Sequence, residues 1–301
     1  MFISSYSQAI QIGALNYVIN KDPLLEHLSY LSSNDLGGRK IASEGNIKAQ
    51  EYIIDQLKHF SISPLNKEYQ HKFIIKKFLN NIMGSNVIAM IPGTIHEQSY
   101  ILLSAHLDHI GVKRNKIYNG ADDNASGTSA LLSIAQQLIK SPLKHSVIFL
   151  FTDGEEVNLT GAKAFVKDHP KFVSDIKLNI NLDMLAGSDK TTKLRYIWRG
   201  INGLMNESDV KRLQILQNSL GISLKKGFKA RTFGGNRNRK WIMSSDHGVF
   251  HRAGIPFIYF GVGTHINYHQ DTDTFDNANH DFFHLATNSI FLQLIFIDQN
   301  I

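Results

Sequence analysis

Apolar and polar positions divide the chain into two kinds of segment. Over 43–60, apolar residues recur from Ile47 to Phe60 at helical spacing, and Glu, Lys, Gln and Asp fill the other face, which predicts an amphipathic helix. Five short segments are instead almost wholly apolar, a pattern typical of strands buried on both faces. These strand segments are 86–91, 100–105, 146–151, 178–183 and 256–260. Further segments with helical spacing are 128–140, 210–220 and 284–297.

Because strands and helices alternate, the predicted fold class is α/β, a single domain with a mixed, mostly parallel sheet flanked by helices. No linker, internal repeat or low-complexity tract interrupts the pattern. We expect residues 1–40 to form an N-terminal extension that packs on the core, and residues 41–301 to form the catalytic domain.

Composition narrows the possible functions. The chain has 301 residues, no cysteine and a formal net charge of +6. These values exclude a disulfide scaffold, cysteine-ligated metals and a cysteine nucleophile. The absence of cysteine favours an oxidising compartment, so we expect a secreted or periplasmic location. No positive residue precedes Lys21 and no apolar run there is long enough to span a bilayer, so neither a clear signal peptide nor a membrane span is expected.

Nucleic acid is not an expected partner, because the net positive charge is a weak excess over a chain of this length. One local basic cluster occurs without any nucleic-acid recognition motif, and we interpret it as a solvated or substrate-facing loop. Its members are Lys229, Arg231, Arg237, Arg239 and Lys240. The sequence carries no signature of an oligomeric state.

Polar residues able to bind metal follow the apolar strands at the points where the strands stop. Since ligands of open α/β sheets bind beyond the carboxyl ends of the strands, these residues are expected to converge. Without a thiolate, histidines and carboxylates form a ligand set suited to Zn²⁺ in a hydrolytic site, and two ions fit better than one. The residues are His106, Asp108, Asp122, Asp123, Glu155, Glu156, Asp183, His265, Tyr268, His269, Asp271 and Asp273.

The motifs resemble those of the co-catalytic zinc aminopeptidases, a family that also includes glutamate carboxypeptidase-like enzymes and the single-metal glutaminyl cyclases. The resemblance covers most of the chain: it begins in 25–39, continues through 49–53 and ends past Asp273. Its most specific element is the Asn-Ala-Ser-Gly sequence at 124–127. The resemblance implies a zinc-exopeptidase three-layer sandwich and two Zn²⁺ ions per chain.

The resemblance also implies metal ligands. His106 and Asp183 would hold one zinc ion, and Glu156 and His269 the other. Asp123 would bridge both, because the bridging acid of the family stands immediately before the Asn-Ala-Ser-Gly element.

Further roles follow from the same resemblance. Glu155 would be the general acid/base that takes a proton from water and returns it to the leaving amine. Asp108 would orient His106. Asp122 would at most contact the metal ligands without binding metal itself. Tyr268 could donate a hydrogen bond to the tetrahedral intermediate, with Tyr259 and His265 as competitors for that role.

The serine-aspartate-histidine element at 245–247 resembles a segment near the substrate pocket of the family. Asp246 is therefore a candidate substrate contact, although its position as a natural helix N-cap is the better-supported interpretation.

The predicted function is a metallo-exopeptidase that hydrolyses peptide bonds by a metal-bridging hydroxide with a Glu general base, acting as an aminopeptidase on peptide substrates. A carboxypeptidase-type member is the first alternative, in which the basic residues of 231–240 would grip a terminal carboxylate. A glutaminyl cyclase and a binding domain that has lost its metals are the others. The intact ligand set counts against both of these.

Overall fold

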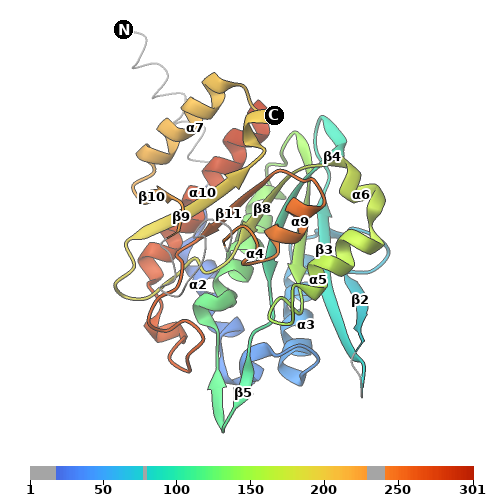
Figure 1. The fold of residues 1–301 in the computed structure, drawn as a ribbon, viewed down its shortest axis with the longest axis vertical. Helices are drawn as coiled ribbons and strands as arrows, with labels where there is room; N and C mark the ends of the chain where they lie inside the picture. The colour runs from blue at the N-terminus through green and yellow to red at the C-terminus, as the bar shows by residue number, and fades with distance from the viewer. Residues whose placement is uncertain (1–17, 77–79, 229–240) are drawn as a thin grey trace.

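The computed structural model describes residues 18–76, 80–228 and 241–301. In these residues nine strands form one sheet in the order β1-β3-β7-β4-β8-β11-β9-β10, with β2 paired to β3 (Figure 1). The strands are β1 (Ser63–Pro64), β2 (Gln70–Ile75), β3 (Ile82–Ile91), β4 (His96–His106), β7 (His145–Thr152), β8 (Ile176–Leu182), β9 (Lys193–Arg199), β10 (Ser223–Lys226) and β11 (Phe257–Gly261). A separate hairpin joins β5 (Gly111–Lys113) to β6 (Lys116–Tyr118).

The centre of the sheet is parallel and its margins are antiparallel. Strands β7, β4, β8 and β11 run in one direction, whereas β3 and β9 run antiparallel to their neighbours β7 and β11. The predicted mixed, mostly parallel sheet is confirmed. Because the four central strands are parallel, their carboxyl ends meet at one edge of the sheet.

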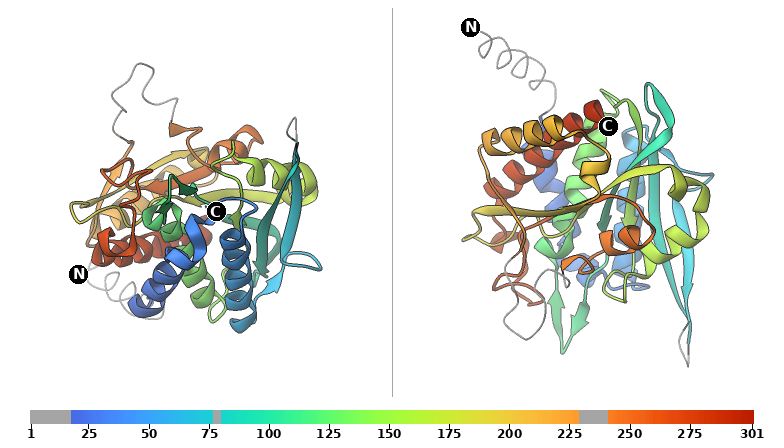
Figure 2. Two further views of the ribbon diagram at one scale, coloured as in Figure 1. Left: turned by 90° about the horizontal axis from the view of Figure 1, so that it is seen from below. Right: turned by 45° about the horizontal axis from the view of Figure 1, so that its top comes forward.

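Helices cover both faces of the sheet (Figures 1 and 2). One face carries α2 (Lys21–Leu31), α3 (Glu44–His59), α4 (Gly127–Leu138) and α10 (His280–Asn300), with α7 (Glu207–Ser219) packed on α10. The other face carries α5 (Thr160–Asp168), α6 (Pro170–Asp175) and α9 (His247–Arg252). None of the helices in the described ranges is long and apolar enough to cross a membrane.

Strand alternation divides the core into two layers. On β4, Ile101 and Leu103 point into the layer beneath α4, while Leu102 points into the layer beneath α5 and α9. On β7, Phe149 and Leu150 face the two layers in the same way. Both faces of the central strands are thus buried, which explains why their sequences are continuous apolar runs.

Helix α3 starts at the residue that its amphipathic pattern predicts. Ser43 is the N-cap, and its side chain accepts a hydrogen bond from the backbone amide of Asn46 at 3.2 Å. The helix then buries Ala49, Ile53 and Leu57, one turn apart, against the sheet and α4.

Strands β9 and β10 were not predicted. The sequence of β9 alternates buried and more exposed positions, and β10 is mostly exposed, because the two lie at the margin of the sheet. Wholly apolar runs indicate only strands that are buried on both faces, and neither β9 nor β10 is such a strand.

One side chain of the segment before residue 40 makes several hydrogen bonds to the loops at the carboxyl edge. Arg39 lies in the short helical segment η1 (Asn34–Arg39) and is 1% exposed. Its guanidinium donates hydrogen bonds to the backbone oxygens of Leu107 (2.8 Å), Asn119 (2.6 Å), Gly120 (2.9 Å) and Leu31. Burial lowers the pKa of Arg39 to about 10, although nearby Asp273 and Asp108 oppose the shift. At that pKa the group remains cationic at neutral pH.

Candidate metal centre

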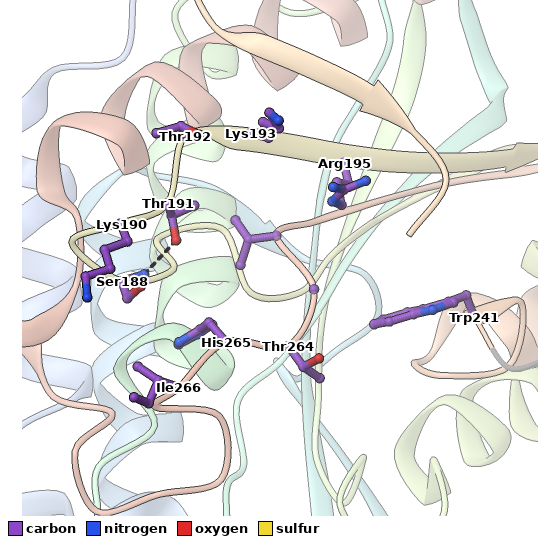
Figure 3. A pocket seen from close by; sticks show the side chains of 12 residues that line it. Ser188, Lys190, Thr191, Thr192, Lys193, Arg195, Trp241, Thr264, His265 and Ile266 are labelled. Carbon is purple, nitrogen blue, oxygen red and sulfur yellow. Dashed lines mark hydrogen bonds between the residues drawn. The ribbon is translucent and has the colours of Figure 1, made fainter. Parts of the chain in front are cut away.

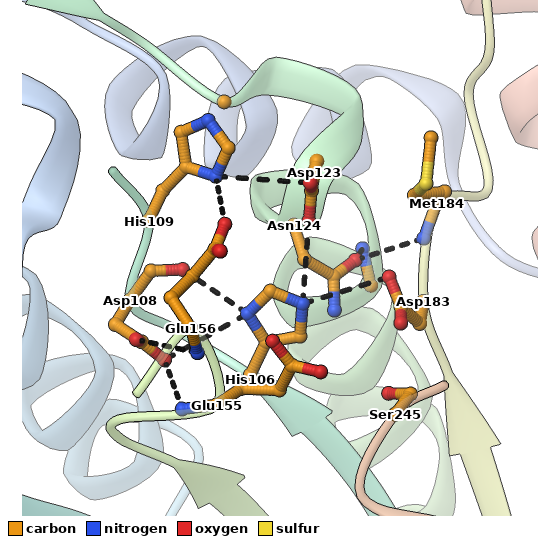
Figure 4. Close-up of polar contacts among 12 residues, drawn as sticks. His106, Asp108, His109, Asp123, Asn124, Glu155, Glu156, Asp183, Met184 and Ser245 are labelled. Carbon is orange, nitrogen blue, oxygen red and sulfur yellow. Dashed lines mark hydrogen bonds and ion pairs between the residues drawn. The ribbon is translucent and has the colours of Figure 1, made fainter. Parts of the chain in front are cut away.

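The five residues predicted to bind metal meet at the carboxyl edge of the parallel strands. Figure 4 shows His106, Asp123, Glu156 and Asp183 there. His106 ends β4, and Asp183 follows β8. Asp123 lies in the short helical segment η2 (Ala121–Ser126) before α4. Glu156 follows β7, and His269 lies in the loop after β11.

We call the first group of these side chains the strand half of the centre: His106, Asp183 and the Oδ1 atom of Asp123. The Nε2 atom of His106 lies 3.4 Å from Asp123 Oδ1 and 3.5 Å from Asp183 Oδ1. All three side chains are at most 8% exposed. Donors bound to one tetrahedral zinc ion stand about 3.3–3.4 Å apart, so these atoms fit such an ion.

The second group, the loop half, contains His269, Glu156 and the Oδ2 atom of Asp123. The Nε2 atom of His269 lies 3.1 Å from Asp123 Oδ2 and 3.4 Å from Glu156 Oε1. His269 is 37% exposed, the most accessible of the five side chains. The two oxygens of Asp123 therefore face separate histidine and carboxylate pairs, which is the arrangement that a bridging ligand requires.

Electrostatic coupling is strong in both halves. Burial opposes ionisation of Asp123, but His106 and His269 hold the pKa of its carboxyl well below the ordinary value. Burial likewise opposes ionisation of Glu156, yet the imidazoles of His109 and His269 lower its pKa to about 2. Burial would lower the pKa of His269, but Asp123 and Glu156 raise it to about 9. The carboxyl groups of Asp123 and Glu156 are thus ionised at neutral pH, whereas burial raises the pKa of Asp183.

The turn after β7 presents Glu155 and Glu156 in different directions (Figure 4). It begins at Gly154, whose φ of 71° is left-handed, and a Cβ there would lie 2.3 Å from the Thr160 hydroxyl. The carboxylate of Asp108 accepts hydrogen bonds from both backbone amides of the turn, at 3.0 Å from Glu155 and 3.3 Å from Glu156. Asp108 therefore fixes the backbone of the turn.

The contact of Asp108 with His106 is looser than its contacts with the turn. The Nδ1 atom of His106 lies 3.1 Å from the backbone oxygen of Asp108 and 3.7 Å from its carboxylate. The backbone oxygen is thus the nearer partner of the imidazole. The carboxylate predicted to orient His106 is directed mainly at the Glu155 and Glu156 amides.

Glu155 lies beside the strand half, where its carboxylate groups with His106 and Asp183 as potential cation donors. Burial raises the pKa of Glu155 well above its ordinary value, His106 opposes this rise, and Asp183 and Asp246 add to it. A carboxyl with this tendency to hold a proton, placed next to a candidate metal site, suits general acid/base chemistry.

Two further carboxylates hold the segment that carries Asp123. Asp273 accepts hydrogen bonds from the backbone amides of Asp122 (2.9 Å) and Asp123 (3.0 Å). Asp122 accepts one from the backbone amide of Ala186 at 2.7 Å and contacts Nε2 of His265 at 2.7 Å. Both carboxylates therefore position the ligand-bearing backbone. No specific role was predicted for Asp273, because its partners lie 150 residues away along the chain.

The predicted substrate contacts occupy different depths. The Tyr268 ring stacks on that of His269, with centroids 4.0 Å apart, and His265 is paired with Asp122. Asp246 is fully buried, and its carboxylate accepts a hydrogen bond from the Thr152 hydroxyl. Asp246 thus lies among the groups behind Glu155 and not on an open surface.

A pocket of about 570 Å³ lies beside the loop that carries the last ligand (Figure 3). His265 lines it, and His265 also contacts Asp122 in the metal centre. Its wall includes three basic side chains, Lys190, Lys193 and Arg195, and the ring of Trp241. The basic residues predicted at 229–240 lie outside the described residues.

Sequence reasoning did not single out His109, which the structure places in the centre. Its Nδ1 atom groups with Asp123 and Glu156 as potential cation donors. The available signal was a second histidine three residues after His106, at the same strand end.

Comparison with known proteins identifies relatives of the chain. The family model described as peptidase family M28 matches residues 86–293. The chain is 28% identical to aminopeptidase YwaD of Bacillus subtilis over 240 residues, which cover 78% of this chain and 45% of that protein. The chain spans from a fifth to about two thirds of the length of the first curated relatives it matches.

Solved structures show the same fold at low sequence identity. An aminopeptidase from Aneurinibacillus sp. strain AM-1 aligns with a TM-score of 0.70 at 16% identity, covering 93% of this chain and 94% of that one. A glutaminyl cyclase from Fimbriiglobus ruber aligns with a TM-score of 0.72 at 17% identity, covering 92% of this chain and 95% of that one. The shared fold alone therefore does not choose between these two activities.

Proposed function

The chain belongs to peptidase family M28, and from this membership we propose that it is a zinc-dependent aminopeptidase with two ions per chain. The observation that carries the proposal is the carboxylate of Asp123. Its two oxygens face His106 at 3.4 Å and His269 at 3.1 Å, and each histidine also faces a carboxylate of its own. One side chain can therefore bind two neighbouring cations.

The donor set fits zinc. Imidazole and carboxylate donors are the ligands of hydrolytic zinc sites. Within the described residues, Oε1 of Glu156 is buried without a hydrogen-bond partner, as expected of an atom meant to bind a cation. When bound, a pair of zinc ions would activate water as a nucleophile at neutral pH and would polarise the scissile carbonyl.

Glu155 acts as the general base and then as the general acid. Its carboxylate takes a proton from the attacking water and passes it to the nitrogen of the departing amine. Asp108 contributes by holding the backbone amides of Glu155 and Glu156, so that one carboxylate faces metal while the other faces substrate. Tyr268, whose ring stacks on that of His269, would donate a hydrogen bond to the developing oxyanion.

The relatives favour a substrate with a free amine. Two curated proteins similar to this chain are named as an aminopeptidase of Bacillus subtilis and a probable leucine aminopeptidase of Arthroderma otae. This likeness supports the aminopeptidase over the carboxypeptidase.

The test is a panel of aminoacyl anilides assayed with zinc, with a chelator, and with zinc restored. We expect hydrolysis that the chelator abolishes and zinc restores. A glutaminyl anilide in the panel distinguishes a cyclase, which would release a pyroglutamyl product. Absence of chelator-sensitive hydrolysis on every free-amine substrate would overturn the proposal.

A carboxypeptidase is the second candidate, because of the basic pocket. Lys190, Lys193 and Arg195 could bind the carboxylate of a substrate terminus or of an acidic side chain. Two peptides of one sequence separate the candidates, one blocked at its amino end and the other amidated at its carboxyl end. The aminopeptidase cleaves only the amidated peptide, and the carboxypeptidase only the blocked one.

A further inference from the structure

His109 is a buried histidine of the metal centre to which no role has yet been given. It follows β4, three residues after His106, and its side chain is 0% exposed. Its Nδ1 atom lies 3.0 Å from Oε1 of Glu156 and 3.8 Å from Oδ2 of Asp123 (Figure 4). These are the same two oxygens that face His269.

The polar atoms of this contact are unsatisfied. Within the described parts of the chain, neither ring nitrogen of His109 makes a hydrogen bond, and neither does Oε1 of Glu156. The two groups face each other at 3.0 Å without hydrogen-bond geometry. A buried polar atom without a hydrogen bond is destabilising, so two such atoms facing each other indicate a missing common partner.

The imidazole is held in this position by its surroundings. Gly120 has a left-handed φ of 61°, and a Cβ there would lie 2.6 Å from Cγ and Cδ2 of the His109 ring. The ring thus packs directly against the glycine backbone. The backbone amide of His109 donates to the carbonyl oxygen of Arg39 at 3.3 Å, which fixes the start of the side chain.

Four candidate donor atoms belong to the loop half: His109 Nδ1, His269 Nε2, Glu156 Oε1 and Asp123 Oδ2. Donor atoms of His109, Asp123 and Glu156 lie within 4.8 Å of one another, and His269 contacts the same two oxygens. Their four measured separations, from each histidine to each carboxylate, are 3.0, 3.8, 3.1 and 3.4 Å. Donors around one tetrahedral zinc ion stand about 3.3–3.4 Å apart, and these separations scatter around that value.

We propose that His109 Nδ1 is a ligand of the cation in the loop half. The inference rests on the proposed two-zinc function and changes the composition of one half. The loop half would have two imidazoles and two carboxylates, whereas the strand half has His106, Asp183 and Asp123. Nitrogen donors favour zinc and cobalt over magnesium and manganese, so the loop half would be the more selective of the two.

The test compares the zinc-loaded wild-type chain with His109→Ala and His109→Asn. X-ray absorption at the zinc edge counts imidazoles per ion. Three imidazoles over two ions give about 1.5 for the wild type, and two give about 1.0 for either variant. Competition with a chromophoric chelator should show that one of the two sites is weakened by at least about 100-fold in the variants.

The matched control is His145→Ala, which removes another buried imidazole that contacts a carboxylate, at 2.9 Å from Asp298 and at the opposite end of β7. It should keep both ions and the wild-type imidazole count. Circular dichroism of each variant shows whether it is folded. If His109→Ala does not fold, the comparison is made with His109→Asn.

Three outcomes would contradict the assignment. An unchanged imidazole count with weakened binding makes His109 a positioning residue for Glu156. Unchanged count and affinity remove it from the centre altogether. A wild-type chain that binds no zinc overturns both the proposed function and this inference. Either of the first two outcomes overturns this inference and leaves the proposed two-zinc centre standing.

Discussion

The two ends of β7 both place a buried histidine against a buried carboxylate, and they differ in how completely the polar atoms are paired. At the amino end, Asp298 accepts hydrogen bonds from Nδ1 of His145 (2.9 Å) and from the backbone amides of Lys144 (2.9 Å) and His145 (3.0 Å). Beyond the carboxyl end, Glu156 and His109 face each other at 3.0 Å, and their facing atoms make no hydrogen bond within the described residues.

The difference separates a structural pair from a binding site. A buried carboxylate that receives three protein donors has no need of an external partner. A cluster in which several carboxylates share few protons is stable only with added positive charge. The two ends should therefore respond in opposite ways to substitution and to metal.

Substitution of the shared ligand should give the largest effect. Asp123→Asn removes the carboxylate that the two halves share. We therefore expect kcat/KM to fall by at least about 10⁴-fold and bound zinc to be lost. Zinc content per chain and hydrolysis of an aminoacyl anilide measure this. Asp298→Asn, the same change at the amino end of β7, should keep its zinc and its activity per folded molecule. Full activity of Asp123→Asn would contradict the assignment.

Substitution of the proposed base should separate chemistry from metal binding. Glu155→Gln keeps the size of the side chain but cannot accept a proton, so kcat should fall about 10²–10⁴-fold. Both zinc ions should remain, because we propose Glu156, and not Glu155, as the metal ligand. Loss of an ion from Glu155→Gln would indicate that the adjacent glutamates have exchanged roles.

Addition of zinc should stabilise the folded chain only when the centre beyond the carboxyl end of β7 is intact. For the wild-type chain stripped of metal, zinc at 1,000 times its dissociation constant should raise the free energy of unfolding by about 4 kcal/mol for each ion bound. Thermal unfolding with and without zinc measures the gain. Asp123→Asn should show no gain, and His145→Ala should show the full gain. An equal gain in all three would place the bound zinc elsewhere.

Removal of a carboxylate at the amino end should lower stability alone. Asp298→Ala leaves a buried histidine and two backbone amides without their acceptor, and we expect the free energy of unfolding to fall by about 3 kcal/mol. Denaturant unfolding measures the loss. Zinc content per folded chain should be unchanged, and a loss of zinc would mean that the two ends are coupled.

Acid should weaken the same pair in a defined range. Burial would raise the pKa of Asp298, but His145 and the two backbone amides hold it below the ordinary value. The folded state therefore binds this proton less readily than the unfolded state, so the stabilisation is complete above about pH 4 and is lost as the pH falls below it. The stability difference between the wild type and Asp298→Asn should shrink across that range, and a constant difference would contradict the assignment.

Much of the fold was predictable, because the central strands are buried on both faces and their apolar runs are unambiguous. The ligand positions were predictable for a related reason, since polar residues such as His106 and Asp183 stand out directly after such runs. In the structure His106 lies close to both Asp123 and Asp183. Which of these side chains bind metal stays a prediction. His109 and Asp273 were not assigned roles, because their importance lies in contacts between distant loops. Similarly, burial of Asp246 depends on how α9 packs against the sheet.

The guanidinium of Arg39 determines how much of the chain a working centre needs. It hydrogen-bonds the carbonyl next to His106 and the carbonyls just before the segment that carries Asp123. The part of the chain that matches the family begins only at residue 86. A fragment trimmed to that match would leave those carbonyls without this donor and both ligand loops with fewer hydrogen bonds. We therefore expect the smallest fragment that keeps the candidate centre intact to start upstream of Arg39.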